Sequence, residues 1–399
     1  MIFNTYWFVF FVCLFFPVYW LLRWPGIRGC WLLAGCVIFH THFAGPAGVI
    51  PIIFLGVVTY ASALSRQRRL CAFAIALCVA SLAFYKYTYF LCRDLLGIFS
   101  PQLAQAASSR AQQWLPAAPP LAISFFAFEF VHYLVEIYRG QEPVRRLRDF
   151  TVFAIFFPSL VAGPIKRYRD FIPELHAGLA RVAVSDVAEG LKRVAIGAFK
   201  KLVIADNLTL YIKFYEGHFT EIRSIDAWEL FAALAFRILF DFSGYSDMAI
   251  GCARMMGIGL PENFNNPYIA KSVSEFWQRW HISLSTWIRD YVYIPLGGNR
   301  LGLGRKLFNG VAAFALCGIW HGPAWHFVLW GLWHGAGLAV NSSYRAALGS
   351  LGRRIAWVFE KVPLLGWSVT LLYVWFGWLL FFYEPARAWT MAVKLLSFR

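Results

Sequence analysis

Long apolar runs, separated by short polar clusters, extend along most of this chain. Many of them reach roughly 18 residues, the length that an α-helix needs to cross the hydrocarbon core of a bilayer. Lipid offers no hydrogen-bond partners to the backbone, so continuous apolar runs predict helices whose backbone groups bond internally. We expect spans over residues 2–22, 28–44, 46–64, 70–91, 119–138, 150–164, 226–255, 307–320, 323–340 and 364–383.

Some segments depart from this pattern. Residues 95–118 form a polar linker that we expect outside the cytoplasm. The run at 150–164 ends in a Gly-Pro pair and has basic flanks, so it is better interpreted as re-entrant than as spanning. Basic residues at helical spacing among the apolar residues of 186–207 predict a helix at the membrane interface. Residues 261–300 are too polar to face lipid, and irregular backbone at that depth is tolerated only inside protein or beside water.

The composition agrees with a membrane protein. Of 399 residues, 59% are hydrophobic and 15% are charged, whereas a soluble domain has about 25% charged residues. The net charge of +16 lies largely in clusters between apolar runs, such as Arg66–Arg69 and Arg145–Arg148. Such clusters favour cytoplasmic loops that contact anionic headgroups over nucleic-acid binding. An anionic substrate captured on that side is the alternative interpretation.

The N-terminal run and the cysteines provide no candidate catalytic or metal-binding residue. Residues 1–7 carry no Lys or Arg and no cleavage site precedes Leu22, so we expect the first run to remain as a spanning helix. The eight cysteines form no CxxC pair and mostly lie in apolar runs, which indicates buried small hydrophobes. No compact His, Cys and carboxylate set has metal-ligand spacing, and no phosphate-binding glycine motif occurs. We therefore expect no bound metal or cofactor.

The polar stretch from Asn263 to Gly335 is the first place to seek function, because ionisable groups in a bilayer usually face a cavity, a partner or a reaction. His321 ends an apolar run and Pro323 follows it, which predicts a helix break beside the histidine. A break opens room for a substrate, and an imidazole accepts a proton near neutral pH. His321 is therefore the leading catalytic candidate. A core histidine bonded to a backbone carbonyl is the alternative.

His281 is the second catalytic candidate. On a helix, Ser285 lies one turn from His281 and Arg289 one turn further, so the three share a face. This face could line a polar tunnel; a surface helix whose charges reach the headgroups is the alternative. The predicted tunnel residues are Trp277, Ser285, Arg289, Asp290 and Trp320.

Two further histidines are weaker candidates. On one helix, His326 and His334 would be separated by roughly 80°, and His334 would lie about 220° from His321, so they would not converge. His334 stands beside Gly331 and Gly335 and is interpreted as a packing or hydrogen-bonding residue.

Asp241 and Asp247 lie in an apolar segment that also holds Arg237. Arg237 and Asp241 are one helical turn apart, and an ion pair between them would neutralise two charges that are costly in lipid. We interpret these charges as structural.

Five longer motifs stand out along the chain. They are PLAISFFAFEFVHYLVEIYRG (120–140), FFPSLVAGPIKRYRDF (156–171), FDFSGYSDMAIGCARMMGI (240–258), FNNPYIAKSVSEFWQRWHISLSTWIRDYVYIPLGGNR (264–300) and IWHGPAWHFVLWGLWHG (319–335). These motifs cover roughly residues 120–340. In sequence and order they resemble the membrane-bound O-acyltransferase (MBOAT) family, and in particular the membrane subunit of bacterial alginate O-acetyltransferases.

The resemblance implies an all-α polytopic membrane protein, a ring of about 10–11 tilted transmembrane helices with re-entrant segments and a central tunnel. A single membrane-embedded acyltransferase domain would occupy residues 1–399. The family's proposed catalytic histidine, in its Trp-His-Gly motif, corresponds to His321, and its other signature histidine to His281. The implied enzyme moves an acyl group from a cytoplasmic thioester, such as acetyl-CoA or an acyl carrier, across the bacterial inner membrane to hydroxyls of an exported glycan. A periplasmic or membrane-anchored SGNH-type acyltransferase is the expected partner.

Other functions stay open at this point. The chain's length is nearer to that of subunits that transfer D-alanyl groups to teichoic acids, whereas Tyr293–Arg300 resembles the alginate type. A transporter would also have broken helices and buried charge, but we find no internal repeat of the kind that inverted-repeat transporters show. A non-catalytic scaffold of an export complex is a third possibility.

Overall fold

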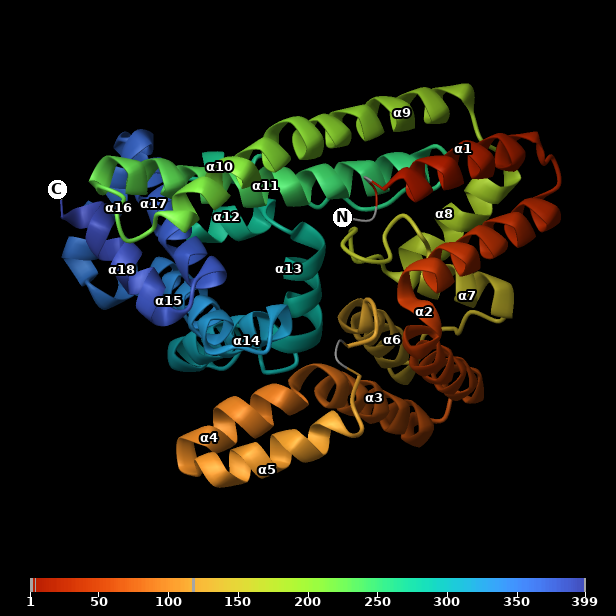
Figure 1. The fold of residues 1–399 in the computed structure, drawn as a ribbon, viewed down its shortest axis with the longest axis horizontal. Coiled ribbons are helices and arrows are strands. Elements are labelled where there is room, and N and C mark those ends of the chain that lie inside the picture. Colours follow the sequence, from red (N-terminus) through yellow and green to blue (C-terminus); the bar gives the residue numbers. More distant parts are fainter. Residues whose placement is uncertain (1–2, 4, 117–118, 398–399) are drawn as a thin grey trace. The chain divides into compact units, whose positions relative to one another are not determined.

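The computed structural model describes Phe3, residues 5–116 and residues 119–397, apart from the side chains of residues 46–47. Every regular element in this part of the chain is a helix, which confirms the predicted all-α class (Figure 1). The described residues divide into two compact units. Unit 1 runs up to Ala198 and includes Tyr245–Pro261; unit 2 comprises Phe199–Gly244 and the residues from Glu262 onward. The expectation of one continuous domain over 1–399 stays a prediction.

Unit 1 contains the N-terminal helices and the end of the long helix α11 (Ser224–Arg254), whose first part belongs to unit 2. Its other elements are α1 (Tyr6–Leu21), α2 (Pro25–Ser65), α3 (Arg68–Leu82), η2 (Ala83–Tyr87), η3 (Phe90–Leu95), α4 (Leu96–Phe99), α5 (Pro101–Gln112), α6 (Ile123–Tyr138), α7 (Leu147–Ile155), α8 (Tyr168–Ala180) and α9 (Val184–Ala198).

Unit 2 contains shorter helices before a C-terminal group of long ones. Its elements are η4 (Phe199–Ala205), α10 (Asp206–Gly217), η5 (Pro267–Ile269), α12 (Val273–Arg279), α13 (Ile282–Ile288), η6 (Arg289–Tyr293), α14 (Gly302–His321), α15 (Trp325–Ala347), α16 (Gly349–Lys361), α17 (Pro363–Phe382) and α18 (Pro385–Leu396).

Membrane-spanning character is clear in the described helices. Stretches long and apolar enough to cross a bilayer are Pro25–Gly45, Gly48–Ser65, Arg68–Tyr87 and Pro363–Phe382, and α1 is a shorter apolar helix. The first two are halves of α2, which bends at Gly45 with a φ of 62°. Glycine adopts such a φ without steric cost, so the predicted boundary between two spans falls on a residue suited to the bend. The chain is a multi-pass membrane protein.

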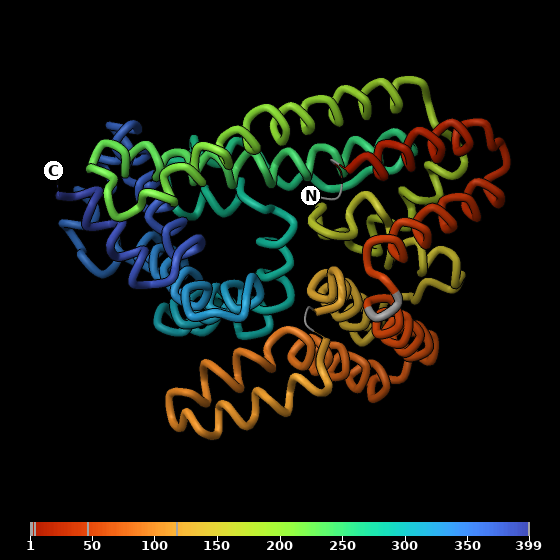
Figure 2. Tube along the Cα trace, in the orientation of Figure 1, coloured from red at the N-terminus to blue at the C-terminus, as the bar shows by residue number. Residues whose placement is uncertain are grey.

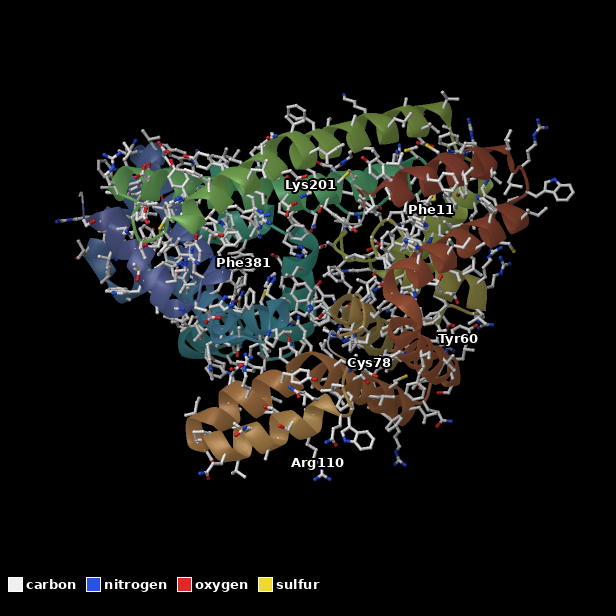
Figure 3. The ribbon with its side chains drawn as sticks, in the orientation of Figure 1. Phe11, Tyr60, Cys78, Arg110, Lys201 and Phe381 are labelled. Atoms are coloured by element: carbon white, nitrogen blue, oxygen red, sulfur yellow. The ribbon has the colours of Figure 1, made fainter. Side chains whose placement is uncertain are left out.

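The core of unit 1 is built from aromatic rings. Phe11, labelled in Figure 3, lies 5.6 Å from Phe15, 5.9 Å from Phe39 and 5.2 Å from Phe157 between ring centroids. These rings come from α1, α2 and the turn after α7, so one cluster ties together segments far apart in sequence. The nine residues of α7 are too few to span a bilayer, in keeping with the short run predicted there.

The predicted polar linker at 95–118 proves to be helical over most of its length. Helices α4 and α5, in orange in Figure 2, occupy Leu96–Phe99 and Pro101–Gln112. The Ser100 hydroxyl accepts a hydrogen bond from the Leu103 backbone N–H at 3.3 Å, and Pro101 occupies the first helical position. Both features start helices. The linker therefore contains helices, for which the Ser-Pro pair was the sequence signal, and its expected place outside the cytoplasm stays a prediction.

The buried charges are paired, as the sequence indicated. Within unit 2, Arg237 lies 3.9 Å from Asp241, and Lys201, labelled in Figure 3, lies 2.9 Å from the same carboxylate. Within unit 1, Arg193 contacts Asp247 at 3.0 Å. These contacts confirm the predicted Arg237–Asp241 pair, and each neutralises charge inside the protein.

Candidate active site

The helix break predicted beside His321 is present. Helix α14 ends at His321 and α15 begins at Trp325. Gly322 lies between them, and a Cβ atom at this position would stand 2.1 Å from the Phe327 ring. Gly322 has no side chain to displace this ring. Phe327 can therefore pack against the turn that follows His321.

Helices α14 and α15 pack closely side by side (Figure 1). Gly318 of α14 faces Gly331 of α15, and a Cβ atom at either position would approach a backbone carbonyl of the opposite helix to 2.2–2.3 Å. The glycines therefore permit backbone contact and set the register of the two helices. That register determines which residues of α15 lie beside His321.

His321 is half-buried among aromatic rings. Its ring centroid lies 4.9 Å from Trp320, 4.9 Å from Trp330 and 5.2 Å from Phe381 of α17; Phe381 is labelled in Figure 3. The ring planes meet these neighbours at 69–84°, an edge-to-face arrangement. The histidine thus has rigid apolar walls and retains partial access.

His281 is almost fully buried and is oriented by Asn263. Its Nδ1 lies 3.0 Å from the side-chain oxygen of Asn263, an oxygen that also accepts hydrogen bonds from the backbone N–H and hydroxyl of Ser283 at 3.3 and 2.8 Å. Because an amide oxygen only accepts hydrogen bonds, Nδ1 carries the proton and Nε2 keeps a lone pair. His281 also has a φ of 43°, a left-handed conformation uncommon outside glycine that often marks functional positions.

The two candidate histidines occupy one region of unit 2. The His281 ring lies 6.4 Å from the Trp320 ring, and Trp320 contacts His321 in turn. Their catalytic roles stay predictions, but the residues that were paired from the sequence do lie together.

A cavity of about 640 Å³ lies beside this region, within unit 2. Three of the predicted tunnel residues, Trp277, Ser285 and Arg289, line it. The other two do not: Asp290 pairs with Arg289 at 2.7 Å, and Trp320 packs between the histidines. In the described ranges, no group of three or more His, Cys, Asp and Glu side chains could hold a metal ion.

His334 lies closer to the site than helical spacing predicted. The expected angle of about 220° assumed that the helix continues past His321, but His321 and His334 belong to different helices that pack together. His334 is fully buried, and the Trp330 ring contacts both the His334 ring, at 5.0 Å, and the His321 ring, at 4.9 Å. His326, in contrast, contacts the Leu380 carbonyl oxygen through Nδ1 at 3.1 Å, which suits a structural role.

Asn263 is a site residue that sequence reasoning missed. It lies 18 residues before His281, and the chain between the two positions is not one continuous helix or strand, so periodicity could not relate them. Its place at the start of the polar stretch was the available signal.

Comparison with known proteins identifies the family of this chain. The model of the membrane-bound O-acyltransferase family matches residues 86–349. A probable alginate O-acetylase of Azotobacter vinelandii is 40% identical over 70% of this chain and 54% of the relative. A peptidoglycan O-acetyltransferase of Helicobacter pylori is 32% identical over 80% of this chain and 62% of the relative. A teichoic acid D-alanyltransferase of Bacillus subtilis is 31% identical over 52% of this chain and 55% of the relative.

The chain spans about half the length of the curated alginate O-acetylases that it matches. The family match is nevertheless continuous over more than half of this chain and contains both His281 and His321. This chain therefore belongs to the membrane-bound O-acyltransferase family.

Proposed function

We propose that this protein is an O-acyltransferase that moves an acyl group, most consistently acetyl, from a cytoplasmic thioester to hydroxyls of an exported polysaccharide. The observation that carries the proposal is the family match that contains both His281 and His321. Both histidines contact the Trp320 ring; one ends a helix at a break and the other has a fixed tautomer. General-base catalysis on a hydroxyl needs a positioned proton acceptor, which an imidazole supplies.

In the proposed reaction His321 takes the proton of the acceptor hydroxyl as its oxygen attacks the thioester carbonyl carbon. A C–O bond forms and a tetrahedral intermediate results. The C–S bond then breaks, the sulfur leaves with the bonding electron pair, and the imidazolium of His321 returns the proton to it. The products are an ester and a thiol. His281 accepts a hydrogen bond at Nε2 from a second hydroxyl of the acceptor and so orients it.

The cavity is the proposed donor site. Hydroxyl groups of Ser272, Ser285 and Thr286 line it, and Arg289 and Lys306 add two cations. Cations and hydroxyl donors suit the phosphates of a coenzyme A thioester or the phosphopantetheine arm of a carrier. Acetyl-CoA is the simplest donor that fits. It acts as a substrate in this proposal, not as a resident cofactor.

The names of the relatives support a glycan acceptor. Relatives named for O-acetylation of alginate and peptidoglycan reach 40% and 32% identity and cover 70% and 80% of this chain, whereas those named for D-alanyl transfer reach 31% and cover 52–56%. Acetyl transfer to a glycan is therefore favoured over D-alanyl transfer. We place the protein in the bacterial inner membrane, with an SGNH-type acyltransferase outside it that completes transfer when the relay is indirect.

Reconstitution tests this proposal. The protein would be purified in detergent, incorporated into liposomes, and supplied with acetyl-CoA labelled in the acetyl group and with an oligosaccharide acceptor on the opposite side. We expect labelled ester on the acceptor, dependent on both thioester and protein. Label from a D-alanyl carrier instead of acetyl-CoA would identify the alternative acyl group. Solute uptake without acyl transfer would show a transporter and overturn the proposal.

A further inference from the structure

A group of buried polar atoms near His321 has no hydrogen-bond partner among the described residues. It comprises both ring nitrogens of His334 and the indole nitrogens of Trp277 and Trp330. The three side chains are 0%, 6% and 1% exposed, respectively. Buried polar groups are bonded in the great majority of cases, and leaving one unsatisfied costs about 1–3 kcal/mol. Such atoms on three side chains in mutual contact are consistent with a polar ligand bound among them.

These residues form one cluster. The His334 ring centroid lies 5.1 Å from Trp277 and 5.0 Å from Trp330, and the two indoles lie 5.8 Å apart. Helix α12 supplies Trp277 and helix α15 supplies the other two. Gly377 of α17 closes one side, since a Cβ atom there would stand 2.7 Å from Nε2 of His334. Three helices therefore hold these side chains in fixed positions.

The cluster extends from the cavity to the candidate base. Trp277 lines the cavity of about 640 Å³. Trp330 contacts the His321 ring at 4.9 Å. The cluster therefore lies between the wall of the cavity and a ring that contacts His321.

We propose that Trp277, Trp330 and His334 bind the carbonyl oxygen of the acyl group that His321 transfers. This inference rests on the proposed function. An indole N–H can only donate a hydrogen bond, so the cluster offers two fixed donors, and the imidazole offers a third or an acceptor according to its tautomer. It contains no carboxylate to bind a cation and no Lys or Arg to bind a phosphate. Donors set in apolar rings match a neutral carbonyl oxygen beside a short methyl group.

The same donors would act on the reaction itself. As the acceptor oxygen adds to the carbonyl carbon, the C=O π electrons move to the carbonyl oxygen, which becomes negative. An electron pair on this oxygen re-forms the C=O π bond when the C–S bond breaks and the sulfur leaves with its bonding pair. Preorganised donors in a site that excludes water stabilise this oxyanion, and removing one such donor typically lowers kcat by about 10²–10³.

Conservative aromatic substitutions separate this role from packing. Trp277→Phe and Trp330→Phe each remove an indole N–H and keep an aromatic ring. Trp378→Phe is the matched control: this ring contacts Trp330 and His334 at 6.1 and 6.0 Å, but its N–H already donates to the Tyr268 hydroxyl at 3.0 Å. Thermal unfolding midpoints of all variants would be measured first in the same detergent.

Binding of two unreactive donor analogues tests the site without turnover. One is a ketone analogue of acetyl-CoA, which keeps a carbonyl at the position of the thioester, and the other is S-ethyl-CoA, which has none there. We expect the wild type and Trp378→Phe to bind the ketone about 10-fold more tightly, the discrimination that one good hydrogen bond provides. Trp277→Phe and Trp330→Phe should each lose part of this discrimination and about 10²-fold in kcat. Full analogue discrimination in both variants would overturn the inference. If the wild type bound the ketone more tightly than S-ethyl-CoA but transferred no acetyl group, the proposed function would be overturned and the carbonyl site would be supported.

Discussion

The side-chain oxygen of Asn263 accepts a hydrogen bond from Nδ1 of His281 at 3.0 Å, and this contact fixes which nitrogen of the histidine can act as a base. Two further hydrogen bonds, both from Ser283, hold that oxygen in place. Asn263 is fully buried. The pair therefore resembles the arrangements in which a buried acceptor orients a catalytic imidazole and sets its tautomer.

Asn263→Ala should lower acyl transfer by about 10–100-fold, the usual effect of removing a group that orients a functional histidine. The reason is that His281 would be free to rotate and to exchange tautomers. The rate of labelled ester formation measures the effect. Ser283→Ala is the control, because it removes one donor to the same oxygen and leaves the His281 contact. A wild-type rate in Asn263→Ala would exclude this orienting role.

His321→Ala should abolish detectable transfer while membrane insertion is retained, since loss of a general base typically costs about 10²–10⁴ in rate. His281→Ala should also impair transfer, with more effect on folding because that ring is 1% exposed. His326→Ala is the control, because His326 bonds to a backbone carbonyl on α17. Comparable transfer by His321→Ala and the control would remove His321 from the mechanism.

Lys306→Gln should weaken capture of a coenzyme A donor, because Lys306 lines the cavity and phosphates bind cations. The KM for acetyl-CoA should rise several-fold at low salt and less at high salt, where electrostatic attraction is screened. The kcat should stay near the wild-type value. An unchanged KM at low salt would show that the phosphates bind elsewhere.

The basic cluster at Arg145, Arg146 and Arg148 offers the competing explanation for donor capture. Arg145 lies 3.7 Å from Glu142 and Arg148 lies 3.0 Å from Asp149. Arg66 also pairs with Glu142 and lowers the pKa of that carboxyl, so it stays ionised beside the cluster. Neutralising all three arginines should weaken donor capture at low salt if they steer the donor. Reversed insertion, or unchanged donor kinetics, would show that the cluster only fixes topology.

The sequence predicted much of this architecture because lipid imposes simple rules. Continuous apolar runs located the helices, and the Pro323 position located the break beside His321, since both effects are local in the chain. The neighbours of His321 were harder to predict. His334 lies near His321, with Trp330 in contact with both, only because α14 and α15 pack against each other. Asn263, which bonds to His281, belongs to a separate loop. Such contacts depend on packing between segments and leave no periodic signal.

Helices α14 and α15 pack too closely to accommodate a side chain at Gly318. A Cβ atom on Gly318 would stand 2.2 Å from the Phe327 carbonyl oxygen and 3.0 Å from the Gly331 backbone. Backbone atoms cannot move aside as a flexible side chain can, so Gly318→Ala must push the helices apart at a cost of about 1–3 kcal/mol. The shift would carry Trp330 and His334 away from His321, so transfer should fall even where folding survives.

Gly304→Ala is the matched control for that variant. Gly304 is on the same helix, and a Cβ atom there would meet nothing within 4 Å. Alanine is favoured over glycine in helices by up to about 1 kcal/mol, so this variant should unfold at an equal or higher temperature with unchanged transfer. Thermal unfolding in detergent and the rate of ester formation, measured on both variants, decide the point. A Gly318→Ala protein as stable and active as Gly304→Ala would show that the register of α14 and α15 does not position the site.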